Sequence, residues 1–268
     1  MKEYIRYFSL FLVIVSIFLS CSDNNPVTAI FMPTEEEEVE MGRVFYNEIK
    51  SDSVNYPSLD LSNPDNKKLY DYINTIGRRI SNSQSNRPEN PSIGFHYTFD
   101  VIDSDTKNAF AIPGGYVFVY KGLLTDMQYE DELAGVLAHE IAHITERHGA
   151  EALARQYRYK FVSQILLGKD SNLLAEILGN MFFLKYSRNN EYEADSLSVV
   201  YSKTANYNPY GMSKFLMTLN SGEYDIMPDL FQTHPDPDDR AARVDSVIKA
   251  NYPETDPSKF TNLDTAGK

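Results

Sequence analysis

The sequence has little cysteine, little positive charge and few long apolar runs, and each shortage excludes a class of protein. Cys21 is the only cysteine in 268 residues, so no intramolecular disulfide can form and a cysteine-rich structural zinc site is disfavoured. The formal net charge of −13 argues against nucleic acid as the main partner, because its phosphate backbone is also negative. Hydrophobic residues still make up 42% of the chain, which is ordinary for a globular protein with one sizeable core or two modest ones.

A marked apolar run, YFSLFLVIVSIFLS, lies within the first 20 residues and follows two basic side chains. It is shorter than the roughly 20 residues of a comfortable membrane span. It therefore predicts a secretory signal peptide over residues 1–20, with a retained N-terminal anchor helix as the alternative. Phe18-Leu19-Ser20-Cys21 is similar to a bacterial lipobox, which implies a lipidated Cys21 and a flexible tether over residues 21–33. Acyl chains on that cysteine would anchor the protein to a membrane surface.

Periodicity in the remaining sequence predicts an α+β fold that is mostly helical and has one small sheet. Thr34 and Glu37 have the spacing of a capping box and predict a helix from there to about residue 49. Alternating apolar residues over 95–102 and an apolar run over 116–120 predict two strands. Pro113 and the two glycines after it favour an edge position for the second strand.

Further apolar periodicity predicts more helices along the chain. The expected ranges are 69–80, 130–148, 150–167, 172–185, 190–203, 208–220 and 238–250. We therefore expect one domain over residues 34–252, followed by a polar and disordered tail over residues 253–268.

The segment HEIAHITERHG begins at His139 and holds three of the chain's five histidines. On a helix that turns about 100° per residue, His139 and His143 project from one face, one turn apart. Two such imidazoles can bind one zinc ion, and Glu140 between them can reach a water molecule at the metal and act as general base. The alternative is a chance match on a solvated helix. His148 would lie about 140° from His143 around a continuous helix, so we expect it to close the helix and not to join the site.

A third ligand is needed, because a catalytic zinc usually takes three protein ligands and keeps one position open. A later helical segment offers Glu191, Glu193 and Asp195. Glu191 and Glu193 would point about 200° apart, so only one of them can face the metal. Glu191 and Asp195 share a face. We therefore predict Glu191 as the third ligand of one zinc per chain and Asp195 as the acceptor that orients a histidine ring, with a solvated acidic face as the alternative.

Several further motifs accompany this pattern and make it specific. They are NAFAIPGGYVFV from residue 108, GLL from residue 122, HEIAH, RHG, SR followed by Glu191 to Asp195, and THP from residue 233 with Arg240. In this combination the chain resembles the gluzincin peptidase family that contains the bacterial HtpX proteases, the CAAX prenyl proteases and the periplasmic outer-membrane quality-control peptidases. The resemblance covers about residues 34–250. Because long membrane spans are lacking, it is closest to the periplasmic branch.

The resemblance implies a zincin-like domain that hydrolyses peptide bonds in misfolded or membrane-associated cell-envelope proteins. His234 would lie on a loop over the zinc, where it either fills the open position and keeps the enzyme latent or is an ordinary loop histidine. Arg240 or a tyrosine could stabilise the oxyanion, and Arg240 could instead be structural. The resemblance also implies an active-site edge strand that pairs with substrate, and its residues are Asn108, Ala109, Phe110 and Ala111.

Two other functions compete with a working peptidase. One is a latent or chaperone-like zinc-binding lipoprotein that assists outer-membrane protein assembly with little proteolysis, although an intact Glu140 argues against a fully inactive enzyme. The other is a structural zinc domain, which the shortage of cysteine disfavours. For the peptidase and for its alternatives, we expect a protein on the periplasmic side of the envelope. It would be anchored through Cys21 in the outer membrane, in reach of the outer-membrane assembly machinery. The role of residues 150–185 stays open.

Overall fold

The computed structural model describes residues 32–84, 95–125, 127–157, 186–220, 234 and 239–264. The predicted signal peptide, Cys21 and the helix expected at 172–185 lie outside these residues. The described part is mainly helical with one three-stranded sheet, which confirms the α+β class. No helix within the described ranges is both long enough and apolar enough to cross a membrane.

The sheet has the strand order β1-β3-β2. β1 (Thr98–Ile102) runs parallel to β3 (Tyr116–Tyr120), and β2 (Ala109–Ile112) runs antiparallel to β3. The prediction that residues 116–120 form an edge strand is wrong, because β3 is central and β2 lies at the edge. The proline and glycines that suggested an edge occupy the turn between β2 and β3, where Gly114 and Gly115 have φ values of +84° and +105°. Glycine adopts such angles without strain, so the turn interrupts neither strand.

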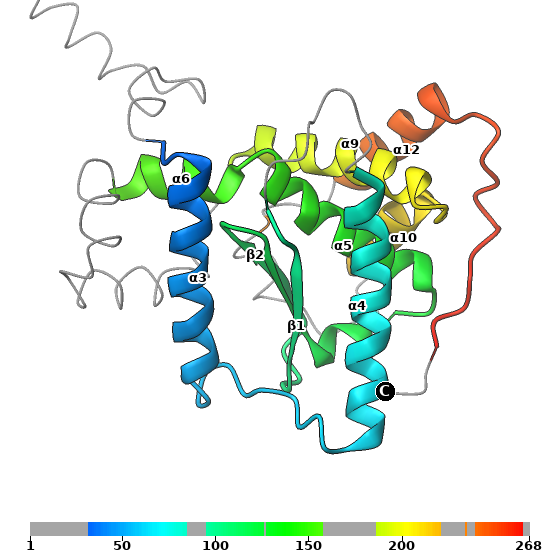
Figure 1. Ribbon diagram of the computed structural model, residues 1–268. Coiled ribbons are helices and arrows are strands. Elements are labelled where there is room, and N and C mark those ends of the chain that lie inside the picture. Colours follow the sequence, from blue (N-terminus) through cyan, green and yellow to red (C-terminus); the bar gives the residue numbers. More distant parts are fainter. Residues whose placement is uncertain are drawn as a thin grey trace, which may run out of the picture.

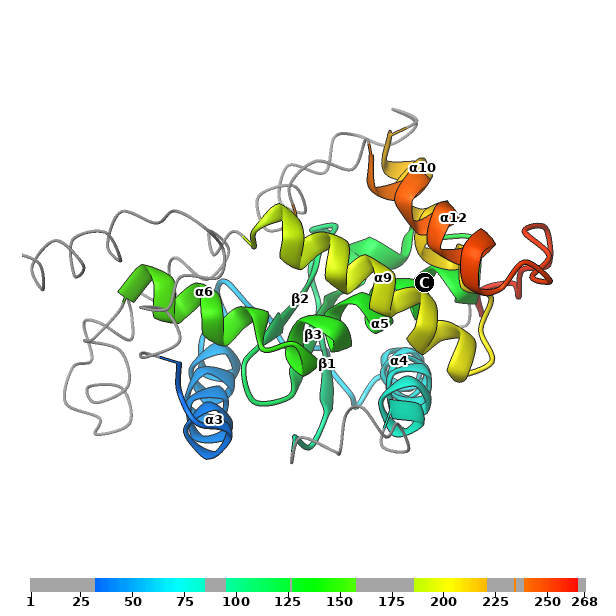
Figure 2. The ribbon, with the colours of Figure 1, turned by 90° about the horizontal axis from the view of Figure 1, so that it is seen from above.

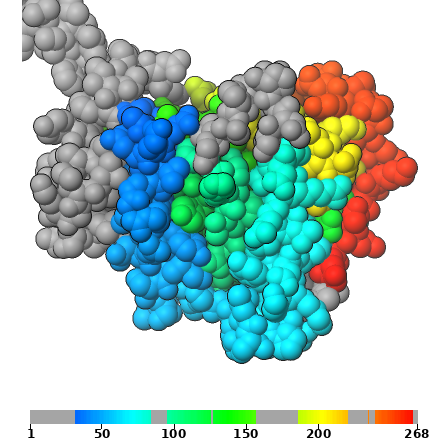
Figure 3. All heavy atoms as spheres, in the orientation of Figure 1, coloured from blue at the N-terminus to red at the C-terminus, as the bar shows by residue number. Residues whose placement is uncertain are grey.

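Alternate side chains of the sheet point into two cores, as the pleat of a strand requires. One face packs with α4 (Pro64–Gln84) and α5 (Glu130–Thr145), and the other packs with α3 (Glu35–Ser51) and α6 (His148–Tyr157). Figure 1 shows the sheet almost edge-on between α3 and α4. In the space-filling view the same two helices stand on either side of the sheet residues (Figure 3). The predicted capping box of Thr34 and Glu37 is confirmed at the start of α3.

α5 is the central helix, and the helices around it fix its position. It packs against α9 (Arg188–Thr204) and α10 (Tyr210–Asn220), and α12 (Arg240–Asn251) covers α9 and α10 from outside (Figure 2). The 3-10 helix η1 (Lys121–Thr125) leads from β3 toward α5.

The crossing of α5 and α10 depends on a glycine. A Cβ atom on Gly135 would lie 2.5 Å from the backbone nitrogen of Met212. Only glycine allows this close approach of two helix backbones. The contact sets how closely α5 and α10 approach each other.

The described end of the chain differs from the disordered tail expected after residue 252. Leu263 donates its N–H to the Gln128 carbonyl at 3.0 Å, and Glu130 donates to the Thr261 carbonyl at 2.8 Å. The Leu263 side chain is buried in the main core. Backbone hydrogen bonds and one apolar anchor therefore order a segment whose composition is mostly polar.

Candidate metal centre

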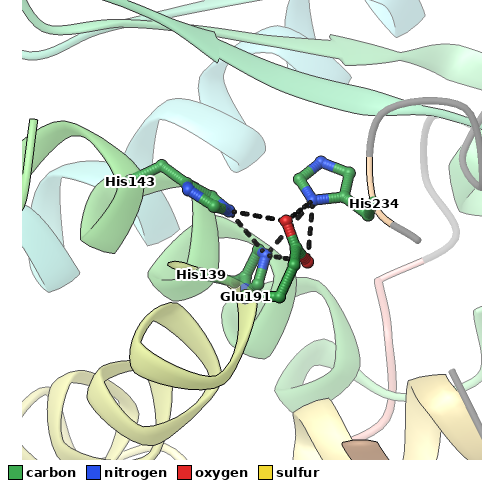
Figure 4. A group of neighbouring side chains, drawn as sticks. All are labelled: His139, His143, Glu191 and His234. Atoms are coloured by element: carbon green, nitrogen blue, oxygen red, sulfur yellow. Dashed lines mark hydrogen bonds and ion pairs between the residues drawn. The ribbon is translucent and has the colours of Figure 1, made fainter. Parts of the chain in front are cut away.

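Three elements bring four polar side chains to one buried point. α5 supplies His139 and His143, α9 supplies Glu191, and the segment between α10 and α12 supplies His234 (Figure 4). One ligand atom from each residue lies within 4.8 Å of the other three. All four residues are buried, so this point is shielded from bulk water.

The distances between these atoms suit a single metal ion. His139 Nε2 lies 3.0 Å from His143 Nε2 and 3.4 Å from His234 Nδ1. Glu191 Oε1 lies 3.0 Å from His234 Nδ1 and 3.5 Å from His143 Nε2. Four N and O ligands at about 2.0–2.1 Å from one zinc ion occupy tetrahedral corners about 3.4 Å apart. The donor set and its spacing therefore fit one zinc ion.

The electrostatics of the cluster also favour a cation. Burial opposes the charged form of Glu191, but His234 and Arg240 outweigh it and hold the pKa of Glu191 well below its ordinary value. Burial likewise opposes a charge on His139, yet the Asp195 and Glu191 carboxylates together raise the pKa of His139 to about 9. Burial lowers the pKa of His143 well below 6.5. The carboxylates of Glu191 and Asp195 thus favour a positive charge at this point.

Asp195 lies behind His139, as the shared helix face of Glu191 and Asp195 predicts. Asp195 Oδ1 is 3.0 Å from His139 Nδ1, although the direction of this contact departs from that of an ideal hydrogen bond. Arg240 donates to Asp195 through Nε and Nη2, both at 2.7 Å, and its Nη1 lies 2.9 Å from Glu191 Oε2. The guanidinium of Arg240 is thus bound to two carboxylates. This favours a structural role for Arg240 over oxyanion stabilisation.

Two residues near His143 have contacts that the sequence alone did not reveal. The Tyr186 ring stacks on the His143 ring, with 3.9 Å between centroids and 17° between planes. His148 Nδ1 lies 3.0 Å from His143 Nδ1, although His148 is not among the residues that could hold a metal. The expectation that it closes the motif helix is wrong, because it begins α6. α5 ends at Thr145 and a turn follows, so the continuous helix assumed for that expectation does not exist. In the sequence, the RHG segment directly after the motif was the signal that could have revealed the contact of His148 with His143.

Glu140 lies between the metal cluster and the edge strand. Its Oε1 atom is 3.5 Å from His234 Nε2, and the backbone N–H of Ala111 in β2 donates to its carboxylate. Burial raises the pKa of Glu140 above its ordinary value. Asn108 precedes β2 and pairs through its backbone carbonyl with the Tyr120 N–H at 3.0 Å. Its fully buried side-chain amide has no hydrogen-bond partner within the part of the chain that the structure describes.

Comparison with known proteins identifies this arrangement. The family model described as Peptidase family M48 matches residues 68–248, a range that runs from within α4 to within α12 and contains every residue of the cluster. The chain belongs to Peptidase family M48. Peptidases of this family use zinc, and the cluster of His139, His143, Glu191 and His234 is able to bind one metal ion.

The relatives of this M48 chain include bacterial proteins and a mitochondrial protein. The beta-barrel assembly-enhancing protease of Yersinia pestis is 33% identical over 206 residues, which are 71% of this chain and 40% of the relative. The protein of the same name from Escherichia coli K12 is 30% identical over 232 residues, or 80% of this chain and 44% of the relative. The mitochondrial metalloendopeptidase OMA1 of Schizosaccharomyces pombe is 33% identical over 153 residues, or 55% and 45%. The chain thus spans less than half the length of these relatives.

Proposed function

We propose that this protein is a zinc-dependent endopeptidase of the cell envelope whose active site is held latent by His234. The observation that carries the proposal is the convergence of His139, His143 and Glu191 beside Glu140, in a buried site next to an edge strand. Membership of a metallopeptidase family supports the same reaction. His139, His143 and Glu191 would hold the zinc. Zinc supplies Lewis acidity to such a site, which lowers the pKa of water at the metal to about 7 and polarises a carbonyl oxygen.

Glu140 is the proposed general base. One of its oxygens, Oε2, has no hydrogen-bond partner among the described residues and lies inside the buried site. A carboxylate in this position can take a proton from water and later transfer it to the leaving amine. The raised pKa of Glu140, caused by its burial, suits this role because proton transfer is most effective when the pKa approaches the working pH. Asp195 and Arg240 would keep His139 and Glu191 in place.

β2 is the proposed site of substrate pairing. The Asn108 carbonyl bonds to β3, so alternation along an antiparallel ladder turns the backbone groups of Ala109 and Ala111 away from β3. The Ala111 N–H already reaches Glu140 on that side. An extended substrate that added to this edge would therefore run past the general base. Phe110 contributes differently, since its ring packs on Phe118 in the core, with 5.1 Å between centroids.

His234 accounts for the proposed latency. Its Nδ1 atom occupies the fourth corner of the cluster, 3.4 Å from His139 Nε2 and 3.0 Å from Glu191 Oε1. A catalytic zinc needs an open position for water or substrate, and a histidine at that corner closes it. His234 is itself in neither a helix nor a strand, so its withdrawal would leave α5 and α9 unchanged.

The proposed substrates are unfolded or misassembled envelope proteins, met on the periplasmic side of the outer membrane. The relatives named as beta-barrel assembly-enhancing proteases support this substrate class and a link to outer-membrane assembly. The lipobox-like segment before Cys21 supports a lipid anchor. A membrane-bound peptidase would then act on proteins that reach the same membrane surface.

Casein degradation tests the catalytic part of the proposal. The chain from Ser22 onward, loaded with zinc, is compared with Glu140→Gln and His234→Ala. We expect the loss of activity in Glu140→Gln, because the general base is removed while the ligands remain. We expect higher activity in His234→Ala, because the fourth corner opens. Zinc content is measured in each variant, so that a lost metal is not mistaken for a lost base.

Two other outcomes would point elsewhere. If no variant cleaves casein although each binds one zinc per chain, the proposal of a general peptidase fails. The protein is then a zinc-binding assembly factor or a peptidase with a very narrow substrate range. If His234→Ala is no more active than the parent, His234 is an ordinary loop histidine and the latency proposal fails.

A further inference from the structure

His148 is a buried histidine in direct contact with a metal ligand. Its side chain is 2% exposed, and its Nδ1 atom lies 3.0 Å from Nδ1 of His143. Its other nitrogen, Nε2, lies 3.4 Å from Glu193 Oε2 on α9. The three residues therefore form a chain that leads from the metal cluster to the protein surface, where 55% of the Glu193 side chain is exposed.

The turn between α5 and α6 produces this contact. α5 ends at Thr145, and Arg147 adopts a φ of +58°, which is rare for a residue with a side chain. Its guanidinium is held by the buried Glu38 carboxylate at 2.7 Å and by the Pro33 carbonyl. The start of α3 thus stabilises the turn that directs His148 back toward His143.

The hydrogen-bonding capacity of the two rings assigns their protons. His143 directs Nε2 at the cluster, so a neutral His143 that binds metal through Nε2 carries its proton on Nδ1. That N–H can donate only if Nδ1 of His148 accepts. His148 must then carry its own proton on Nε2, the atom that faces Glu193.

We propose that His148, held by Glu193, is a positioning residue that accepts the His143 Nδ1–H and fixes the ring orientation and tautomer needed for zinc binding. A histidine that binds a metal generally donates its second ring N–H to a hydrogen-bond acceptor. Loss of that acceptor commonly costs about 10–100-fold in metal affinity. The proposal takes His143 as a ligand, as the proposed function does. Its tests read zinc affinity and a ring hydrogen bond, so they are independent of whether the protein cleaves peptides.

A matched pair of substitutions isolates the accepted hydrogen bond. Asparagine and leucine have similar sizes, but only the asparagine Oδ1 can accept a hydrogen bond at the place of the imidazole Nδ1. We expect His148→Leu to bind zinc about 10–100-fold more weakly than the parent, and His148→Asn to stay within about threefold. Affinity is measured on the full-length protein by competition with a chromophoric chelator. His96→Asn, an exposed histidine outside the site, is the control and should leave affinity unchanged.

A spectroscopic test needs no substitution in the site. In zinc-loaded protein with ¹⁵N-labelled histidine, an N–H···N hydrogen bond gives a scalar coupling between the two Nδ1 nuclei. We expect this coupling between His143 and His148, with the proton on His143. Its absence in the folded, zinc-loaded protein would overturn the proposal, even if the His148 variants fail to fold. Equal zinc affinity in His148→Leu and His148→Asn, whether unchanged or reduced, would overturn it as well.

Discussion

His139 and His143 lie one turn apart on the same helix, yet the groups behind them differ in charge. Behind His139 stand Asp195 and Arg240, both buried and joined by two hydrogen bonds of 2.7 Å. Behind His143 stands the imidazole of His148, whose carboxylate partner is largely exposed. The proposed ligand His139 therefore lies against a buried ion pair, whereas the proposed ligand His143 lies against a second imidazole. Equivalent positions in a sequence motif thus have unequal energetic surroundings.

The largest expected effect comes from removing the cation of the buried ion pair behind His139. Arg240→Leu leaves the Glu191 and Asp195 carboxylates buried without their cation, and removal of one partner from a buried ion pair costs about 3–5 kcal/mol. Urea unfolding of the zinc-free protein measures this loss. The matched control is Arg243→Leu on the same helix, where an exposed guanidinium lies 3.9 Å from the Tyr192 ring and its removal should cost about 0.5–1 kcal/mol. Equal losses in the two variants would contradict the ion-pair account.

A pH series on zinc-free protein sharpens the difference in charge. The pKa of His139 is raised from 6.5 to about 9 in the folded protein. A raised folded-state pKa contributes stability that is complete below pH 6.5 and is lost as the pH rises through about 9. The change is on the order of 3 kcal/mol, at 1.36 kcal/mol per pKa unit. His143, whose pKa is lowered, adds nothing in this window.

The measurement for this series is the free energy of unfolding at about pH 7, where an unperturbed histidine is already mostly neutral, and at the alkaline end of the window. We expect Asp195→Asn to flatten the decline, because the carboxylate that favours the His139 imidazolium is gone. A decline of the same size in Asp195→Asn and in the parent would place the responsible charge elsewhere.

The zinc-bound protein should show a smaller effect of the same substitution. Asp195→Asn removes the charge behind His139 but keeps the size of the side chain. We expect zinc affinity to fall about 10–100-fold, the usual result of losing the group that orients a ligating histidine. Competition with a chelator measures it, and thermal unfolding of the loaded protein checks that the fold is kept. Unchanged affinity would mean that Asp195 serves only Arg240.

The smallest effect is expected on the neutral side of the comparison. Glu193→Gln is the matched substitution on α9, and it keeps an oxygen that can accept from His148. Because 55% of the Glu193 side chain is exposed, water screens its charge, and we expect zinc affinity to stay within about threefold of the parent. The same chelator competition decides this. A loss as large as that of Asp195→Asn would show that the two ligands have equally charged surroundings.

Much of the fold was predictable because local signals were strong. The capping box at Thr34 follows from the spacing of two polar residues, and the helix over α4 and the strand at β1 follow from periodicity that packing did not override. The order of the strands was not predictable in the same way. Pro113 and the glycines after it marked a turn, but sequence alone does not say which of two adjacent strands faces the sheet interior.

The candidate site likewise has parts that the sequence predicted and parts that it did not. Helical spacing by itself put His139 and His143 on one face, and it joined Glu191 to Asp195 on another helix. The end of α5 was different, because the sequence pattern predicted a continuous helix that stops only at residue 148. The actual break depends on Arg147, whose unusual backbone angle is held by Glu38 from a distant helix.

The sequence by itself determined the H-E-x-x-H motif and the family pattern around it, and it predicted Glu191 as a further ligand, because these rest on short spacings and on residue chemistry. Only the tertiary structure decided which groups lie behind each ligand. Arg240 reaches Asp195 from α12, and His148 returns to His143 through a turn that α3 stabilises. Such contacts join segments far apart in the chain, so they depend on how the helices pack and not on any local pattern of residues.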